Sequence, residues 1–242
     1  VPMTLNDASY TCKIPTADVK EGSYTLKFSS EDKLGNPLEI SLPPLYYDKA
    51  DPTIELQGNV PERIGPKSSS TTVSVKMEDS NELKSFIATL IKKSGNDESW
   101  KDEKNIPANK TSHTENVELK ASNFTKGDGV YILRIECKDV AEKSSKVIEK
   151  EIVFDSTSPT LNVTTLFPEW INTRTYKVEG TATDGTGIGV KVVKYKLNDV
   201  YKTALSGKDS WDGYVELNEG ENRLSFFAED EVKNESEESV CN

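Results

Sequence analysis

The sequence predicts an all-β chain of tandem β-sandwich units arranged in an elongated array, and three observations support this fold class. Apolar residues alternate with polar ones over short runs such as Tyr131-Leu133-Ile135, the pattern of an antiparallel strand with one buried face. Gly, Asn, Asp and Ser separate the runs, as expected for a sandwich of short strands. The third observation is an internal repeat of domain size.

The repeat matches two stretches without a gap at a constant offset of 107 residues, because residue 22 falls onto 129 and residue 54 onto 161. The matched pairs are Gly22 with Gly129, Tyr24 with Tyr131, Leu26 with Leu133, Phe28 with Ile135, Asp32 with Asp139, Asp48 with Asp155, Pro52 with Pro159, and Ile54 with Leu161. A shorter match at an offset of 91 takes Gly129 onto Gly220 and Asp139 onto Asp230. Tandem copies of one module are therefore expected, and such modules are usually structural or adhesive.

The repeat also predicts the domain boundaries. Residues 1–50 correspond to the C-terminal part of a truncated unit, 51–156 to a unit, and 157–242 to a unit that lacks its last few residues. On this interpretation the chain is a window cut from a longer array. We refer to these ranges as the first, second and third units.

Alternation predicts further strands in the second and third units. They are Thr71–Met77, Phe86–Lys92, Glu115–Leu119, Lys146–Phe154, Tyr176–Ala182, Val192–Leu197 and Gly213–Leu217. The segment Glu82–Ile91 can also be read as a helix, but its β-branched and aromatic residues after an Asp-Ser-Asn turn favour a strand. Trp211 is expected to fill the core of the third unit.

The junctions between units are short and contain proline. They read Asp48-Lys-Ala-Asp-Pro-Thr-Ile and Asp155-Ser-Thr-Ser-Pro-Thr-Leu. Proline fixes its own φ angle and biases the preceding residue toward an extended conformation. The last strand of one unit is therefore expected to pass directly into the next unit, which predicts a stiff rod.

Composition and charge exclude several classes of function. The net charge of −11 argues against binding to nucleic acid or to anionic membranes, and the chain has no apolar run of transmembrane length. The cysteines Cys12, Cys137 and Cys241 fall one in each unit, so no unit can form an internal disulfide. His113 is the only histidine, which leaves no catalytic triad or histidine-rich zinc site. We expect no enzymatic activity.

A recurrent pattern, Gly-x-Tyr-x-Leu followed by Asp-x-x-Gly-Asn and Tyr/Phe-Asp-x-x-x-Pro-Thr-Ile, covers nearly the whole chain. In the first unit it is carried by Gly22, Tyr24, Leu26, Asp32, Gly35, Asn36, Tyr47, Asp48, Pro52, Thr53 and Ile54. Tyr24 and Tyr131 hold the place of the tyrosine corner of immunoglobulin-like sandwiches, whereas Asn222 stands there in the third unit. The pattern resembles bacterial immunoglobulin-like tandem repeats of cell-surface adhesins and host-protein-binding proteins. The resemblance implies immunoglobulin-like sandwiches and an extracellular location, at a bacterial cell surface or secreted.

The first functional hypothesis that follows is binding of a host extracellular protein, with host immunoglobulin as one candidate, or presentation of an adhesive domain. The alternatives are a passive rigid stalk and an ancillary β-sandwich of a secreted carbohydrate-active enzyme. Residues that could contact a partner are Trp100, Ile106 and Pro107 in the long segment Lys92–Glu115, and Tyr195 and Tyr201 in the third unit. A hairpin that folds back on its own sheet is an equally plausible role for the long segment.

Calcium is a possible cofactor at the junctions, because aspartates gather near the expected ends of the units. Asp32, Asp48 and Asp51 are assigned to the first junction, and Asp139 and Asp155 to the second. Calcium takes six to eight oxygen ligands, which two neighbouring units could supply together. The alternative is that these aspartates only end strands in Asx-turns.

Overall fold

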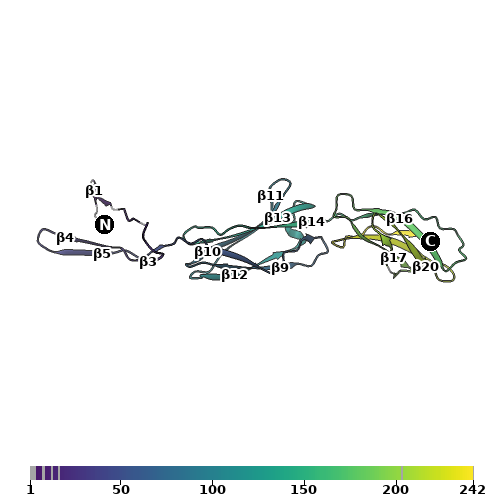
Figure 1. Cartoon of the computed structure of the whole chain (residues 1–242), viewed down its shortest axis with the longest axis horizontal. Coiled ribbons are helices and arrows are strands. Elements are labelled where there is room, and N and C mark those ends of the chain that lie inside the picture. Colours follow the sequence, from purple (N-terminus) through teal and green to yellow (C-terminus); the bar gives the residue numbers. More distant parts are fainter. Residues whose placement is uncertain (1–3, 7–8, 12, 16, 203, 242) are drawn as a thin grey trace.

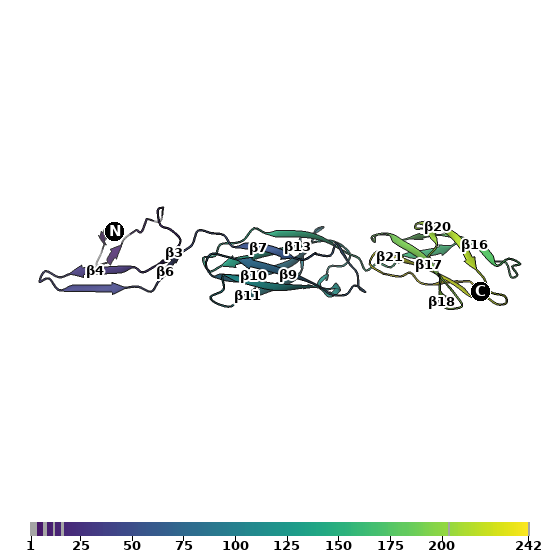
Figure 2. The same ribbon diagram turned by 60° about the horizontal axis from the view of Figure 1, so that its bottom comes forward.

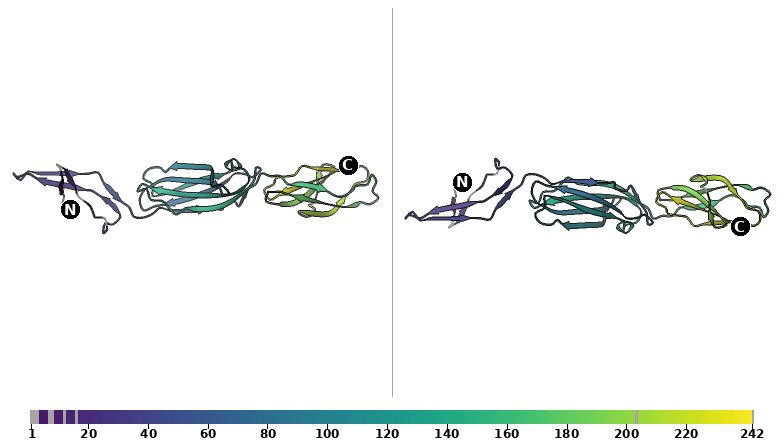
Figure 3. Two further views of the ribbon diagram at one scale, coloured as in Figure 1. Left: turned by 90° about the horizontal axis from the view of Figure 1, so that it is seen from above. Right: turned by 90° about the horizontal axis from the view of Figure 1, so that it is seen from below.

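The computed structural model describes residues 4–6, 9–11, 13–15, 17–202 and 204–241, so Cys12 lies outside the described residues. Three parts follow one another along the long axis of the molecule (Figure 1). Views from above and below show the same linear order (Figure 3). The all-β class and the elongated array are confirmed.

The second unit is a sandwich of two sheets. One sheet has the strand order β11-β10-β13-β14-β8 and the other β12-β9-β7, and all pairs are antiparallel except β14 with β8. The strands are β7 (Thr53–Gln57), β8 (Arg63–Ile64), β9 (Thr71–Glu78), β10 (Leu83–Lys92), β11 (Asp97–Asn105), β12 (Ser112–Leu119), β13 (Gly129–Asp139) and β14 (Ile148–Phe154), with one short 3-10 turn, η1 (Ala121–Asn123). The first two strands of this unit lie in different sheets, β7 in the three-stranded sheet and β8 in the five-stranded one. Strands of an immunoglobulin-like sandwich are divided between two sheets in this way.

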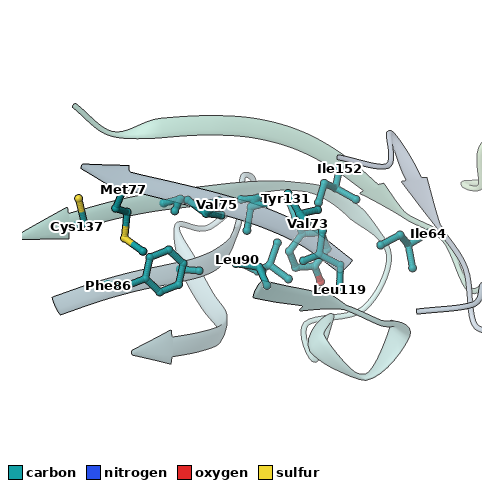
Figure 4. Packing of buried hydrophobic residues seen from close by; sticks show 14 of the residues in the cluster. Ile64, Val73, Val75, Met77, Phe86, Leu90, Leu119, Tyr131, Cys137 and Ile152 are labelled. Atoms are coloured by element: carbon teal, nitrogen blue, oxygen red, sulfur yellow. The ribbon is translucent and has the colours of Figure 1, made fainter. Parts of the chain in front are cut away.

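Alternating side chains from both sheets fill the core of this unit. Phe86 of β10 lies beside Met77 of β9 in Figure 4, and Leu90 of β10 and Val75 of β9 belong to the same fully buried cluster. Cys137 continues this inward series and is 1% exposed. Burial raises the pKa of the Cys137 thiol to about 11, which disfavours the reactive thiolate.

The third unit repeats this plan. Its sheets have the orders β15-β16-β20-β19 and β18-β17-β21-β22. The strands are β15 (Thr160–Val163), β16 (Thr175–Thr183), β17 (Val190–Leu197), β18 (Val200–Tyr201), β19 (Ser206–Gly207), β20 (Ser210–Glu216), β21 (Leu224–Asp230) and β22 (Ser239–Cys241). Trp211 is 2% exposed and stacks on Phe226, which confirms its expected place in the core.

The described residues of the first unit form three pairs of strands, and no sheet formed by them covers these pairs. Its strands are β1 (Thr4–Asn6), β2 (Ser9–Thr11), β3 (Gly22–Tyr24), β4 (Lys27–Glu31), β5 (Pro37–Ser41) and β6 (Leu45–Tyr47), paired as β1-β2, β3-β6 and β4-β5. Figure 2 shows the β4-β5 hairpin reaching away from the second unit. Among the described residues, no helix is long and apolar enough to cross a membrane.

The tyrosine corner is present in two units and is replaced in the third. The hydroxyl groups of Tyr24 and Tyr131 donate to the carbonyl oxygens four residues earlier, Lys20 at 2.7 Å and Gly127 at 2.5 Å. In the third unit the amide of Asn222 donates to the carbonyl oxygen of Asn218, also four residues earlier, at 2.9 Å. The side-chain amide of Asn222 therefore makes the same kind of hydrogen bond that the tyrosine hydroxyl makes in the other two units.

Candidate functional site

Three carboxylates meet at the first junction, and they come from two units. Asp48 follows β6 of the first unit, Asp79 follows β9, and Asp139 ends β13. One carboxylate oxygen of each lies within 4.8 Å of the others. Asp139 is fully buried, and the other two are half-buried. We call this set the first triad.

The second junction repeats the arrangement at equivalent places. Asp155 follows β14 of the second unit, Asp184 follows β16, and Asp230 ends β21 of the third unit. Their oxygens also lie within 4.8 Å of one another, and all three side chains are buried. We call this set the second triad.

Backbone amides hold most of these carboxylates by one oxygen. At the first triad, Oδ1 of Asp48 accepts from Ala50 N at 3.0 Å, and Oδ1 of Asp79 accepts from Asn81 N at 2.7 Å. Oδ1 of Asp139 accepts from the amide of Lys143 at 2.9 Å. The expected Asx-turns are therefore present, and they orient the remaining oxygen of each carboxylate instead of excluding a metal role.

The remaining oxygens are short of partners. At the first triad, Oδ2 of Asp48, Asp79 and Asp139 is buried and accepts no hydrogen bond from the described residues. At the second triad the same holds for Oδ1 of Asp184, while Oδ2 of Asp155 accepts from Ile188 N at 3.0 Å. Among the described residues, none of the six carboxylates forms an ion pair with lysine or arginine.

Like charges in this arrangement are costly. Two unit charges about 5 Å apart repel by roughly 3 kcal/mol at an effective dielectric constant of about 20. Burial and the neighbouring charges of Asp48 and Asp139 raise the pKa of Asp79. In the same way, burial and the charges of Asp155 and Asp230 raise the pKa of Asp184. Each triad is thus a local concentration of acidic groups that no lysine or arginine of the described residues neutralises in an ion pair.

The donor set defines what each triad can bind. Carboxylate oxygens without nitrogen or sulfur ligands suit a hard divalent cation such as calcium. A calcium ion with ligands at about 2.3–2.6 Å spans oxygens up to roughly 5 Å apart, so one ion can touch all three. The residues present therefore fit the cation that the sequence suggested.

The structure regroups the predicted metal residues and corrects two of them. Asp139 joins Asp48 at the first junction rather than Asp155 at the second. Asp32 is wrong as a member of the first junction, because it lies in the turn between β4 and β5, in the hairpin that points away from the second unit (Figure 1). Asp51 is also outside the triad, since it is exposed and pairs with Lys143 at 3.2 Å. Sequence reasoning did not identify Asp79, Asp184 or Asp230 as members of a site.

Further contacts hold the second and third units together. The side-chain amide of Asn234 donates to the carbonyl oxygens of Asp155 at 3.2 Å and Thr157 at 3.1 Å. Lys67 pairs with Glu235 at 3.2 Å, although both side chains are about half exposed. Asn234 is 4% exposed, so its two bonds are shielded from water and matter more than the surface ion pair.

The residues predicted to contact a partner divide into buried and accessible ones. Ile106 is 7% exposed and belongs to the core of the second unit, so it cannot form part of a surface hot spot. Tyr195 is 4% exposed and lies in the core of the third unit, which corrects its expected place on an exposed face. Trp100 is half-buried against the core, while Pro107 and Tyr201 are exposed.

The long segment Lys92–Glu115 folds back on its own sheet, which was the alternative left open for it. Its strand β11 pairs along β10 and forms the edge of the five-stranded sheet. Charged side chains cover this edge, with ion pairs from Lys101 to Glu103 and from Lys104 to Glu115. Charges on an edge strand hinder pairing with another chain, so this edge is not arranged for strand addition.

A groove of about 740 Å³ lies in the third unit. Its lining includes Phe167, Trp170, Leu224 and Cys241. In the second unit a short strand, β8, pairs through Arg63 and Ile64 with Val153 and Phe154 of β14. We do not assign a small-molecule ligand to the groove.

The chain was compared with protein families, with curated proteins and with solved structures. No family model and no curated protein matches the sequence. Among solved structures, the fibronectin(III)-like modules of CbhA from Clostridium thermocellum are 14% identical, with a TM-score of 0.41, over 78% of this chain and 91% of that chain. The FN1-FN3 domains of chicken CNTN1 are 10% identical, with a TM-score of 0.36, over 90% of this chain and 76% of that chain. Because both TM-scores are below 0.5, the immunoglobulin-like fold rests on the strand order and cores of this chain.

Proposed function

We propose that this chain is a non-catalytic spacer of an extracellular bacterial protein, which keeps successive immunoglobulin-like units in line. The observation that carries the proposal is the recurrence of one junction. The carboxylates of Asp48, Asp79 and Asp139 at the first junction have counterparts in Asp155, Asp184 and Asp230 at the second. A chain whose only task was a local activity of one unit would have no need to reproduce the contact between units.

The hydrogen bonds around the triads support the same proposal. Glu21 accepts from the amide of Lys49 at 2.9 Å, and at the equivalent place Asp128 accepts from the amide of Ser156 at 2.7 Å. Burial opposes ionisation of Asp128, but hydrogen bonds from Ser156 and Thr157 outweigh it and lower its pKa. Each connecting segment is thus tied to the unit that precedes it, which limits the angles that the next unit can take.

The spacer function is tested by loosening one junction. Insertion of Gly-Gly-Ser between Ser158 and Pro159 leaves each unit folded and broadens the distribution of angles between the second and third units, measured by electron microscopy or small-angle scattering. A matched control inserts the same three residues in the exposed β4-β5 turn after Lys33, which leaves both junctions intact. If the unaltered protein already samples wide angles, the spacer proposal is wrong.

Binding of a host extracellular protein, immunoglobulin included, is the second candidate, and one surface favours it. Tyr201 and Val200 form the edge strand β18 and are 60% and 57% exposed. The Tyr201 ring is held by an edge contact to Phe227 at 5.6 Å and by Lys196 at 4.6 Å, so it is presented in one orientation. An ordered, exposed aromatic residue is typical of an interface hot spot.

This candidate is tested by capture from host secretions with the full chain. Tyr201→Ala reduces capture at least tenfold if β18 carries the contact, whereas Tyr214→Ala, which removes a 69% exposed tyrosine from the other sheet, leaves it unchanged. Trp100→Ala tests the second unit in the same assay. Equal capture by all three variants would contradict a binding site at these residues.

A further inference from the structure

We infer that each junction is a calcium site, in which one ion is bound by carboxylates of two adjacent units. The role of the ion rests on the proposed spacer function, because the ion would hold adjacent units in line. The first ion is held by Asp48, Asp79 and Asp139, and the second by Asp155, Asp184 and Asp230.

The triads alone would not establish a site, because acidic clusters are common at strand ends. A second observation points to a ligand. Oδ2 of Asp139 lies on a side chain that is 0% exposed, and Oδ1 of Asp184 lies on one that is 5% exposed, yet neither accepts a hydrogen bond from the described residues. A buried carboxylate oxygen without a donor is costly unless a cation meets it.

The way the carboxylates are held also fits a cation. At the first triad each carboxylate has one oxygen fixed by a backbone amide, from Ala50, Asn81 or Lys143, while its other oxygen is buried and accepts no hydrogen bond from the described residues. The three ligand oxygens are therefore oriented before an ion binds. The backbone hydrogen bonds need not break when the ion enters.

The second triad differs in detail. Oδ2 of Asp230 accepts from the side-chain amide of Asn234 at 2.8 Å, and Oδ2 of Asp155 accepts from Ile188 N at 3.0 Å. A carboxylate oxygen has two acceptor positions, so each can keep its donor and still bind an ion. Asn234 then acts as a positioning residue, since it orients Asp230 and also binds the backbone of Asp155 and Thr157.

The set of ligands favours calcium over magnesium. Magnesium keeps most of its water and is usually bound through one or two carboxylates, whereas calcium accepts several carboxylates in a flexible geometry. A set of three carboxylates from two units is therefore typical of calcium and not of magnesium. Water or backbone carbonyl groups would supply the remaining oxygens of the six to eight that calcium takes.

The test counts ions on the full chain. Protein stripped of metal is titrated with calcium chloride by calorimetry, and the number of bound ions is checked by native mass spectrometry. We expect two ions per chain. Asp48→Asn and Asp139→Asn should each leave one ion, although these residues belong to different units. The double variant Asp48→Asn/Asp139→Asn should also leave one, whereas Asp48→Asn/Asp230→Asn should leave none.

Matched controls make each outcome decisive. Asp32→Asn changes the exposed repeat equivalent of Asp139. Oδ1 of Asp32 accepts from the backbone amide four residues later, as Oδ1 of Asp139 does, but Asp32 belongs to neither triad, so this variant should retain two ions. Circular dichroism confirms that each variant is folded, and Asp79→Asn, a half-buried member of the same triad in the second unit, replaces Asp139→Asn if the buried substitution prevents folding. Two ions in both Asp48→Asn and Asp139→Asn, or none in the unaltered chain, would overturn the inference. Loss of calcium binding in an equal concentration of magnesium chloride would overturn the assignment to calcium.

This experiment is independent of the spacer test. An array whose junction angles are narrow but which binds no ion would contradict the calcium sites and leave the spacer function standing. An array that binds two ions but samples wide angles would contradict the spacer function and leave the sites standing.

Discussion

The side-chain amide of Asn234 lies across the second junction from Asp155 and donates a hydrogen bond to its backbone carbonyl oxygen at 3.2 Å. The same amide donates to Thr157 O and to Asp230 Oδ2. One buried side chain therefore connects the end of the second unit to the turn between β21 and β22 of the third. At the first junction the equivalent position holds Lys143, whose ammonium group donates to the carbonyl oxygen of Lys49 at 2.9 Å.

Asn234→Ala should destabilise the third unit by about 1–3 kcal/mol, because buried acceptors lose their donor. Chemical denaturation followed by fluorescence measures this change. Lys143→Ala is the matched control at the equivalent position, and it should cost less than about 1 kcal/mol, since the Lys143 side chain is 32% exposed. Equal effects of the two substitutions would contradict the role assigned to Asn234.

Gly65→Ala should disturb the contact between the second and third units. A Cβ atom at Gly65 would lie 2.7 Å from Cγ2 of Val232, which is shorter than real contacts of this kind. We expect a loss of about 1–3 kcal/mol in the stability of the third unit, as for other overpacked positions. Val232→Ala removes this methyl group but keeps Cβ, which would lie 2.8 Å from the added atom, so the double variant should recover only part of the loss. A double variant no more stable than Gly65→Ala would show that the contact with Val232 does not limit the junction.

Tyr131→Phe should lower the free energy of unfolding of the second unit by about 1 kcal/mol, because it removes the hydrogen bond to Gly127 O at 2.5 Å and little else. Tyr24→Phe removes the equivalent bond in the first unit, where the tyrosine is 37% exposed, and the loss there should be smaller. Thermal unfolding of both variants tests the comparison. A neutral Tyr131→Phe would contradict a stabilising role for the tyrosine corner.

Cys137 should not react with a disulfide reagent such as DTNB in the folded protein at pH 8. Burial raises the pKa of its thiol to about 11, so almost no thiolate is present at that pH, and the sulfur lies in the core. The measurement uses a variant in which Cys12 and Cys241 are replaced by serine. Rapid modification before unfolding would show that the core of the second unit opens readily.

Strand positions were predictable where apolar residues alternate. Residues 71–77 and 86–92 were both recognised, and they lie within β9 and β10. β11 was not among the strands predicted from alternation, although a hairpin in its segment was left open, because its sequence, DESWKDEKN, is almost entirely polar. It forms by pairing with the edge of β10. Such pairing depends on the neighbouring strand, and the alternation of apolar residues within a segment cannot predict it.

The metal residues were predictable only in part, for reasons of topology. Asp139 was assigned to the second junction together with Asp155, since both were placed near the expected end of the second unit. β13 runs in the opposite direction to β14, however, so the end of β13 lies at the far end of the unit, beside Asp48. Asp79 and Asp184 are separated by 105 residues rather than 107, since the loops before them differ in length, and the constant offset therefore did not match them.

Small-angle scattering of the unaltered chain, first with calcium chloride and then with an excess of a calcium chelator, tests most directly whether ions at the junctions hold the units in line. With calcium we expect a rod with a narrow distribution of maximum dimension. Removal of calcium should shorten the mean maximum dimension and broaden its distribution, and the Asp48→Asn/Asp230→Asn variant should behave like the chelated protein at any calcium concentration. Identical scattering with calcium and with chelator, in a protein that calorimetry shows to bind two ions, would contradict the account.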